Sequence, residues 1–115
     1  MKVVLTLLSP PPSLNNSTYN VPGKGRVKTR AYKDWRRDAA WQLKLQKPPH
    51  FTGLVSVTIM LPMNTRGDAD NRIKAALDSL QEAGVVKNDR QCCPVLIDRG
   101  NVEVTTITIE PRPEL

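Results

Sequence analysis

Alternation of apolar and polar residues marks the strands of this chain, because successive strand side chains point to opposite faces of a sheet. Two segments alternate clearly enough to predict strands: residues 54–63, expected to be half buried on one face, and residues 102–110. Residues 2–8 are also expected to form a strand, because their composition favours one and the prolines after them end it. A fourth strand is expected over residues 92–98, where Pro94 cannot donate a backbone hydrogen bond and therefore indicates a sheet edge or a bulge. Residues 99–101 have the composition of a hairpin turn, and the Asn-, Pro- and Gly-rich residues 13–26 are expected to form a loop.

Two other segments repeat their apolar residues at the spacing of a helix. The first runs from residue 29 or 30 to about residue 46, and its apolar stripe consists of Tyr32, Trp35, Ala39 and Leu43. The second is expected to begin with Asp70 or Asn71 as its N-cap and to end at Gly84. Its apolar positions are Ile73, Leu77 and Leu80.

These elements follow one another in the order β, α, β, α, β, β. A chain of 115 residues is near the commonest domain size, and no repeat or linker divides it. We therefore predict a single α+β domain over residues 1–115, with a mixed or antiparallel sheet and two main helices. No apolar run approaches the length of a membrane span, and the apolar start leads into Pro10–Pro12 instead of a cleavage pattern, so we expect a cytoplasmic protein without a membrane partner.

The positive charge of the chain is concentrated in one segment. The formal net charge is +6, and between residues 24 and 47 nine Lys and Arg residues stand against two Asp residues, a local balance of +7. This distribution is expected of a nucleic-acid-binding surface. The candidate nucleic-acid-binding residues are Lys24, Arg26, Lys28, Arg30, Lys33, Arg36 and Arg37. The first four occupy every second position, a spacing that can follow a phosphate backbone; alternatively, these charges serve only solubility.

The aromatic, cysteine and histidine residues offer little chemistry of their own. Trp35 and Trp41 could stack on exposed bases, but aromatic residues at helical spacing are more often core residues. Cys92 and Cys93 are adjacent and His50 is the single histidine, so the sequence contains neither a disulfide framework nor a zinc motif. We expect buried, inert thiols and a histidine that is an ordinary loop residue.

Acidic residues gather at the start of the second predicted helix. Asp68 and Asp70 project from the same face of an extended segment, so both can reach one cation. Lys74 follows Asp70 by one helical turn, and Asp89 returns to the same level if residues 85–87 run back along the helix. Three carboxylates and a lysine suit one or two Mg²⁺ ions that act on a phosphodiester. The alternative is that the two first acids cap the helix and favour its dipole.

The whole string from Asp68 to Gln91 resembles the signature of the RusA family of Holliday junction resolvases. It reads Asp-x-Asp-Asn-x-x-Lys-Ala-x-x-Asp-x-Leu-x-x-Ala-Gly-Val, and then continues to Asn-Asp-x-Gln without a gap. By the motif, Asp68, Asp70 and Asp89 fall on the family's catalytic, metal-binding aspartates and Lys74 on its functional lysine. Asp78 also matches, and a structural role suits its position. A weaker part of the resemblance consists of Pro11, Pro12, Ser13, Asn15 and Asn16.

The resemblance implies a RusA-like fold and a Mg²⁺-dependent homodimer that makes paired nicks in four-way DNA junctions. In that function branched DNA is the partner, no small-molecule substrate is needed, and the cell is bacterial or phage-infected. Two other functions remain open at this point. One is a non-catalytic DNA-binding or architectural module, and the other is a Mg²⁺-dependent nuclease that acts on flaps or RNA.

Overall fold

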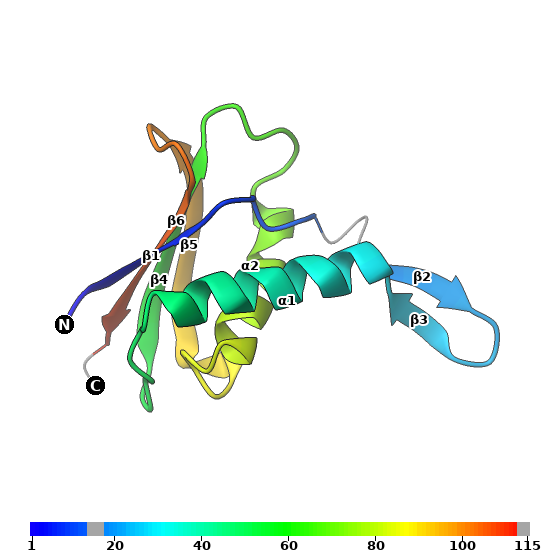
Figure 1. Cartoon of the computed structure of the whole chain (residues 1–115), viewed down its shortest axis with the longest axis horizontal. Helices are drawn as coiled ribbons and strands as arrows, with labels where there is room; N and C mark the ends of the chain where they lie inside the picture. The colour runs from blue at the N-terminus through cyan, green and yellow to red at the C-terminus, as the bar shows by residue number, and fades with distance from the viewer. Residues whose placement is uncertain (14–17, 113–115) are drawn as a thin grey trace.

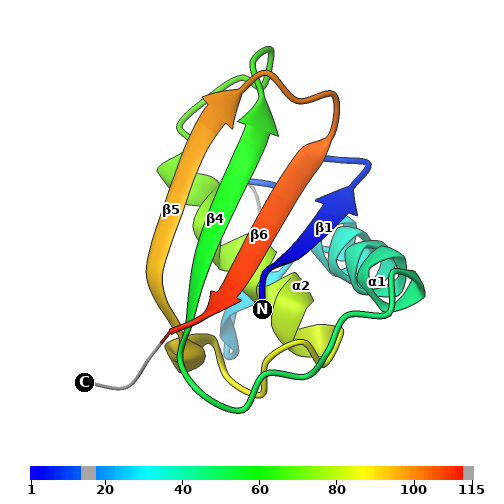
Figure 2. The same ribbon diagram turned by 90° about the vertical axis from the view of Figure 1, so that its left-hand side faces the viewer.

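The computed structural model describes residues 1–13 and 18–112, and these residues form two layers (Figure 1). One layer is a four-stranded sheet with the strand order β1-β6-β4-β5 (Figure 2). Its strands are β1 (Val3–Leu7), β4 (Val55–Pro62), β5 (Cys92–Gly100) and β6 (Thr105–Pro111). β5 is parallel to β4, whereas β6 is antiparallel to both β1 and β4. The prediction of an α+β fold with a mixed sheet and two main helices is therefore confirmed.

The core lies between the sheet and the helices, and β4 is at its centre. Alternate residues of β4 are buried, namely Val55, Val57, Ile59 and Leu61. The neighbouring strands continue this layer with Leu5, Leu7, Ile107 and Ile109. Figure 2 shows both helices behind the sheet, so within the described chain the opposite face of the sheet is not covered by another element. No helix of the described residues is long and apolar enough to cross a membrane.

Helix α1 (Arg30–Leu45) agrees closely with its predicted bounds. The Thr29 hydroxyl caps its start by accepting a hydrogen bond from the backbone N–H of Tyr32 at 3.1 Å. The predicted apolar stripe faces the core, where Tyr32, Ala39 and Leu43 are buried and Trp35 packs against the buried cluster. Trp41 does not join them, since it is 64% exposed on another face of the helix. The expectation that aromatic residues serve the core holds for Trp35 and is wrong for Trp41.

Helix α2 (Ile73–Glu82) begins later than predicted. Asp70 and Asn71 lie in a short 3-10 helix, η2 (Asp70–Arg72), which leads into α2, and within the described structure neither helix start has a side-chain cap. The predicted N-cap role of Asp70 or Asn71 is therefore wrong. At the other end Gly84 adopts a φ of +80°, and the backbone N–H of Val85 bonds the carbonyl of Leu80, as expected of a glycine that ends a helix.

Two short strands replace part of the predicted loop. β2 (Thr18–Val21) and β3 (Gly25–Lys28) pair as an antiparallel hairpin that projects from the start of α1 (Figure 1). The loop prediction for residues 13–26 is therefore wrong from residue 18 onward. The residues that suggested a loop form the turn between the strands, where Gly23 has a positive φ of 82°. Asn15 and Asn16, which the motif resemblance included, lie outside the described residues.

The C-terminal strands are adjacent in sequence but not in the sheet. β4 lies between β5 and β6, so the predicted hairpin turn at residues 99–101 is wrong. The chain instead crosses over the end of β4 before β6 begins at Thr105, three residues later than predicted. The prediction about Pro94 is confirmed, because β5 is an edge strand and its register against β4 shifts between Val55 and Val57.

The cysteines and the histidine differ from one another in their surroundings. Cys92 is buried, whereas Cys93 is exposed, so the prediction of two buried thiols is wrong for Cys93. Burial, together with the nearby charge of Asp89, raises the pKa of Cys92 to about 11. His50 has a partner, since its Nδ1 lies 2.6 Å from the carbonyl oxygen of Gly84 and links the loop before β4 to the end of α2.

Candidate active site

Asp89 is carried on a firmly bonded turn between α2 and β5. The turn is a short 3-10 helix, η3 (Asp89–Gln91), with Asn88 as its N-cap. The Asn88 side chain accepts a hydrogen bond from the backbone of Arg90 at 2.9 Å. Gln91 Oε1 accepts from the backbone N–H groups of Asn88 and Lys87 at 3.1 and 2.9 Å, and its Nε2 donates to two carbonyls before β4. The motif residues around Asp89 therefore fix the turn that presents its carboxylate.

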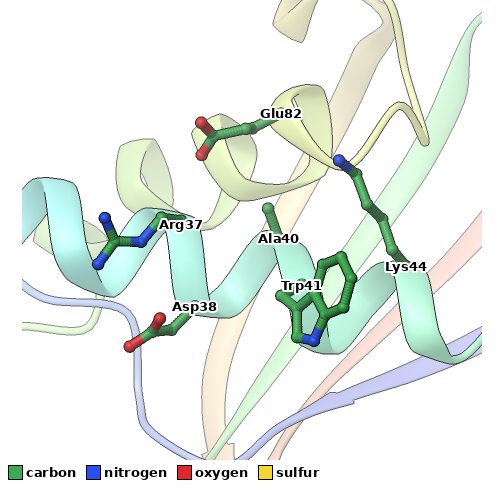
Figure 3. A pocket seen from close by; sticks show the side chains of 6 residues that line it. All are labelled: Arg37, Asp38, Ala40, Trp41, Lys44 and Glu82. Atoms are coloured by element: carbon green, nitrogen blue, oxygen red, sulfur yellow. The ribbon is translucent and has the colours of Figure 1, made fainter.

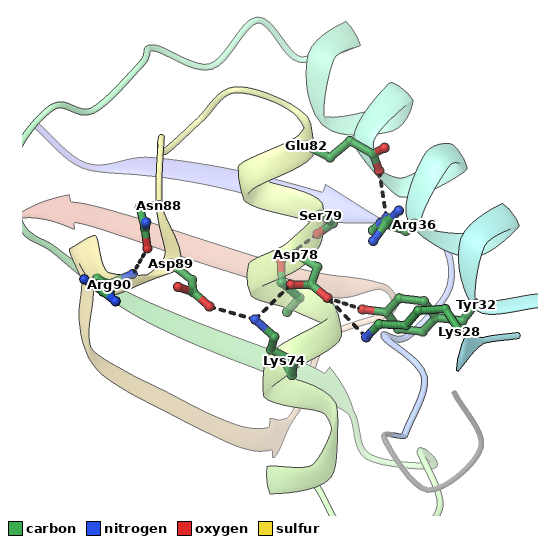
Figure 4. A network of polar contacts seen from close by, with 11 residues as sticks. Lys28, Tyr32, Arg36, Lys74, Asp78, Ser79, Glu82, Asn88, Asp89 and Arg90 are labelled. Atoms are coloured by element: carbon green, nitrogen blue, oxygen red, sulfur yellow. Dashed lines mark hydrogen bonds and ion pairs between the residues drawn. The ribbon is translucent and has the colours of Figure 1, made fainter. Parts of the chain in front are cut away.

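Lys74 joins this turn to the first part of α2 (Figure 4). Its Nζ donates a hydrogen bond of 2.7 Å to Asp89 Oδ2 and lies 3.2 Å from Asp78 Oδ1, which is one helical turn further along α2. The ammonium is thus held between carboxylates from two different elements. Its side chain is 46% exposed, so it also remains open to a ligand from solvent.

The charges of this pair stabilise one another. The hydrogen bond from Lys74 lowers the pKa of Asp89, and its positive charge acts in the same direction. The hydrogen bond to Asp89, and a further one to Asp78, raise the pKa of Lys74 more than its partial burial lowers it. Both groups are therefore ionised at neutral pH.

Asp78 is the meeting point of three elements. The Tyr32 hydroxyl, from α1, donates a hydrogen bond to Asp78 Oδ2. Lys28 Nζ, at the end of β3, lies 3.9 Å from the same oxygen and 4.3 Å from the centre of the Tyr32 ring. Burial first, and then the bond to Asp78, raise the pKa of Tyr32, so its hydroxyl stays protonated as a donor. The base of the hairpin is thereby connected to the helix that carries Lys74.

The segment before Asp68 is held by two guanidinium groups. Arg99, on β5, donates from Nε to the Thr65 carbonyl at 2.8 Å and from Nη2 to the Gly67 carbonyl. Arg72 donates from Nη2 to the Arg66 carbonyl at 2.6 Å, and its Nη1 reaches the loop after β1. Gly67 adopts a φ of +86°, which glycine adopts without strain. The chain is therefore fixed immediately before the first acid of the motif.

Comparison with known proteins decides which family these residues belong to. The family model for endodeoxyribonuclease RusA matches residues 8–111. The chain belongs to the RusA family. A relative, the crossover junction endodeoxyribonuclease RusA of Aquifex aeolicus (strain VF5), is 32% identical over 97 residues, which cover 77% of this chain and 74% of the relative. The predicted membership in this family of Holliday junction resolvases is confirmed, and with it the prediction of an endodeoxyribonuclease that hydrolyses phosphodiester bonds.

In this RusA-family chain the three predicted metal ligands do not form one cluster. Among the described residues, no group of three or more His, Cys, Asp and Glu side chains is arranged to hold a metal ion. Asp68 and Asp70 are exposed, and Asp89 is engaged by Lys74. Carboxylates are the right donors for Mg²⁺, so the residue types fit the ion, but the arrangement does not group them. Their catalytic and metal-binding roles stay predictions.

The predicted DNA-binding residues differ in their acidic neighbours and in their exposure, and Arg30 and Arg37 are both paired and exposed. Lys28 contacts Asp78, Arg36 lies 3.3 Å from Glu82 of α2, and Arg37 and Arg30 lie 3.3 and 3.9 Å from Asp34. The exposed residues of the set, on the hairpin and on α1, are Lys24, Arg26, Arg30, Lys33 and Arg37. These cations follow the hairpin and the first half of α1, which is compatible with the predicted DNA surface but does not test it.

Further along α1, exposed Trp41 borders a pocket between α1 and the end of α2 (Figure 3). The residues that line it are Arg37, Asp38, Ala40, Trp41, Lys44 and Glu82. Two of the charged groups are acidic, so the pocket does not present a uniformly cationic surface for a phosphate. No sequence pattern predicts this pocket, because Glu82 of α2 comes next to α1 only through tertiary packing.

Sequence reasoning treated Asp78 as structural and did not connect Tyr32 or Lys28 with the motif. The available signal was the four-residue spacing from Lys74 to Asp78, which brings the two side chains together on one helix face. The contact from Tyr32 could not be found in this way, since it depends on how α1 packs against α2.

Proposed function

We propose that this RusA-family endodeoxyribonuclease cuts four-way DNA junctions by paired nicks and depends on Mg²⁺. Asp68, Asp70 and Asp89 are the proposed metal ligands, and Lys74 is the proposed catalytic lysine. The observation that carries the proposal is the 2.7 Å contact between Lys74 and Asp89, because it joins the two ends of the motif on an exposed surface. The relative's name, a crossover junction endodeoxyribonuclease, supports the choice of substrate.

In the proposed reaction, Lys74 would contact the phosphate, and Arg72 and Arg99 would position the acids. When bound, Mg²⁺ supplies a bound water of lowered pKa and neutralises charge on the phosphate. Lys74 has three N–H donors, of which two are directed at Asp78 and Asp89, so the third can be given to a phosphate oxygen. An ammonium held in position stabilises negative charge that develops there. Arg99 and Arg72 fix the segment that leads to the acids.

The arms of the junction would lie along the hairpin and α1. Cations on these elements neutralise phosphates without reading bases, which suits an enzyme that recognises the shape of branched DNA. Lys24 and Arg26 on the projecting hairpin can reach DNA beyond the body of the protein (Figure 1). The proposed setting is the cytoplasm of a bacterial or phage-infected cell, where such junctions form.

The proposal includes a homodimer, because a four-way junction is nearly two-fold symmetric and two cuts need two sites. A chain of net charge +6 repels its own copy except through an uncharged surface. The uncovered sheet face supplies one at its centre, and the exposed Asp98, opposite Met60, borders it. The uncharged side chains there are Val4, Thr6, Thr58, Met60, Leu96, Thr106 and Thr108. Leu96 is 56% exposed there. The β1 edge is a poorer candidate, since the Gln46 side chain already bonds both backbone groups of Thr6.

Light scattering at micromolar concentration tests this interface. We expect a dimer for the parent chain and a monomer for Leu96→Glu, which places a charged carboxylate from each copy within the interface. Leu45→Glu is the matched control, because Leu45 is similarly exposed on the helix side of the molecule and should leave the dimer intact. A dimeric Leu96→Glu protein would refute the sheet-face interface.

Separate measurements of cutting and binding test the activity. Asp70→Asn should abolish Mg²⁺-dependent cutting of a four-way junction yet preserve or tighten its binding, because the variant loses a metal ligand and a negative charge. Asp38→Asn is the control: it removes the same charge from α1 and should leave cutting intact. Equal loss of cutting and binding by Asp70→Asn would assign Asp70 to folding instead. Flaps, linear duplex and RNA serve as competing substrates, and faster cutting of any of them would overturn the junction assignment.

A further inference from the structure

Asp78 is more buried than the other acids of the motif and has more partners. Its side chain is 14% exposed, and its two oxygens receive contacts from α1, α2 and β3. The Tyr32 hydroxyl bonds Oδ2, whereas Lys74 lies 3.2 Å from Oδ1. The two oxygens therefore contact different groups: Oδ2 fixes the carboxylate against α1, and Oδ1 faces Lys74 (Figure 4).

A lysine ammonium on a flexible four-carbon stem needs such a partner if it is to occupy one place. Asp89 alone would leave Lys74 free to swing about a single contact. With Asp78 on the other side, the ammonium is held between two carboxylates at 3.2 and 2.7 Å. Tyr32 keeps the Asp78 carboxylate in one orientation, because its bulky ring is buried and its hydroxyl donates to only one oxygen.

We propose that Asp78, oriented by Tyr32, is a positioning residue that sets where the Lys74 ammonium stands beside Asp89. This inference rests on the proposed function of Lys74. It assigns to Asp78 no contact with the DNA or with a metal ion. The alternative is that Asp78 only links α1 to α2 and so contributes to the stability of the fold.

The first experiment compares cleavage of a four-way junction under single-turnover conditions with junction affinity. Asp78→Asn should lower the cleavage rate about ten- to a hundredfold, as expected when a catalytic group is misplaced. It should not weaken junction binding, because the change removes a negative charge and releases Lys28. Tyr32→Phe should have the same kind of effect, but smaller, because the carboxylate remains. Glu82→Gln is the matched control, since it breaks the Arg36–Glu82 ion pair, at 3.3 Å, which also links α1 to α2, without touching Lys74. If Glu82→Gln slows cleavage as much as Asp78→Asn, then Asp78 has only a structural role.

The second experiment combines each change with Lys74→Met. If Asp78 acts through Lys74, then Asp78→Asn should slow cleavage no further once the lysine is absent. A slow Lys74→Met protein that Asp78→Asn slows again would overturn the inference and leave the proposed function standing. A Lys74→Met protein that cuts at the parent rate would instead remove Lys74 from the proposed function, and the inference with it.

A third readout needs neither DNA nor activity. The rate at which a mild acylating reagent modifies Lys74, followed by mass spectrometry on the folded protein, should rise severalfold in Asp78→Asn and in Tyr32→Phe, because the amine is released from one carboxylate. Lys44, exposed on α1, is the internal reference and should not change. An unchanged rate at Lys74 in both folded variants would overturn the inference. Tyr32→Phe decides the matter if Asp78→Asn does not fold.

Discussion

The Gln91 side chain offers the sharpest test of how the site is held, because it makes four hydrogen bonds to backbone groups. Its Oε1 accepts from Lys87 and Asn88 at 2.9 and 3.1 Å, and its Nε2 donates to Phe51 and Gly53 at 2.8 and 2.9 Å. A typical bond of this kind contributes about 1 kcal/mol net, and water can replace some of them at this partly exposed position. We therefore expect Gln91→Ala to lower the free energy of unfolding by roughly 2–3 kcal/mol.

Gln91→Glu tests the acceptor contacts of Oε1 separately from the donor contacts of Nε2. One carboxylate oxygen can keep both acceptor contacts, but the other then faces the carbonyl oxygens of Phe51 and Gly53 without a proton to donate. The repulsion raises the pKa of the introduced carboxyl in the folded state above its value of about 4.3 in the unfolded chain. The folded state therefore binds the proton more tightly, and the penalty of the substitution grows as the pH rises from about 4.3 through the folded pKa.

Urea unfolding followed by circular dichroism, at about pH 4.5 and pH 7, measures both effects relative to the parent. Gln91→Glu should be destabilised more at the higher pH, and both variants should cut DNA more slowly because the turn that presents Asp89 loosens. Gln81→Ala, an exposed glutamine on α2, is the control and should lie within about 0.5 kcal/mol of the parent. If Gln91→Ala and Gln91→Glu also lie in that range at both pH values, the bonds do not hold the turn.

Three further predictions follow from the contacts around the site. The pKa of Asp89 is lowered and that of Lys74 is raised, so their pair stabilises the folded state between about pH 5 and 9, by at most about 1 kcal/mol because it is exposed. Urea unfolding at several pH values should therefore show a difference in the free energy of unfolding between the parent and Asp89→Asn in this range. The difference should vanish as Asp89 is protonated in acid or Lys74 is deprotonated in base. Arg99→Met should increase hydrogen exchange in residues 63–68, and unchanged exchange would show that the guanidinium is dispensable. Iodoacetamide should modify Cys93 in the native protein but Cys92 only after unfolding, and early modification of Cys92 would contradict its burial.

The elements that carry the core could be predicted because their patterns are local. Apolar residues occupy every second position of β4, and the stripe of α1 repeats at helical spacing, so burial of one face follows from the order of residues alone. The pairing of the strands could not be predicted in the same way. β5 and β6 adjoin in sequence, yet β4 separates them, and this order depends on pairing between residues far apart in the chain, which no local pattern shows.

The hairpin of β2 and β3 was missed because its strands are four residues each, and the turn residues between them dominate the local composition. The hairpin also contacts α2, which is far from it in the sequence. Lys28 ends β3 but contacts the ring of Tyr32 on α1 and the carboxylate of Asp78 on α2. The regular row of cations in the sequence is therefore divided in the structure. Lys28 is engaged at the base of the hairpin, Arg30 begins α1 and lies 3.9 Å from Asp34, and Lys24 and Arg26 are exposed nearer the tip.

The candidate site shows the same limit of local reasoning, and the reason is electrostatic. The spacing in the sequence pointed to the acids and the lysine of the motif, whose roles stay predictions, but did not show which of them would pair. Two carboxylates at about 4 Å repel by about 1 kcal/mol in water and about 4 kcal/mol at the effective dielectric of a protein surface, whereas an ammonium at that distance attracts a carboxylate equally strongly. Asp89 accordingly turns to Lys74, and Asp78 takes the other side of the same ammonium. Because both acids share the single positive charge of Lys74, a variant that removes either carboxylate also changes the contact between the ammonium and the other one.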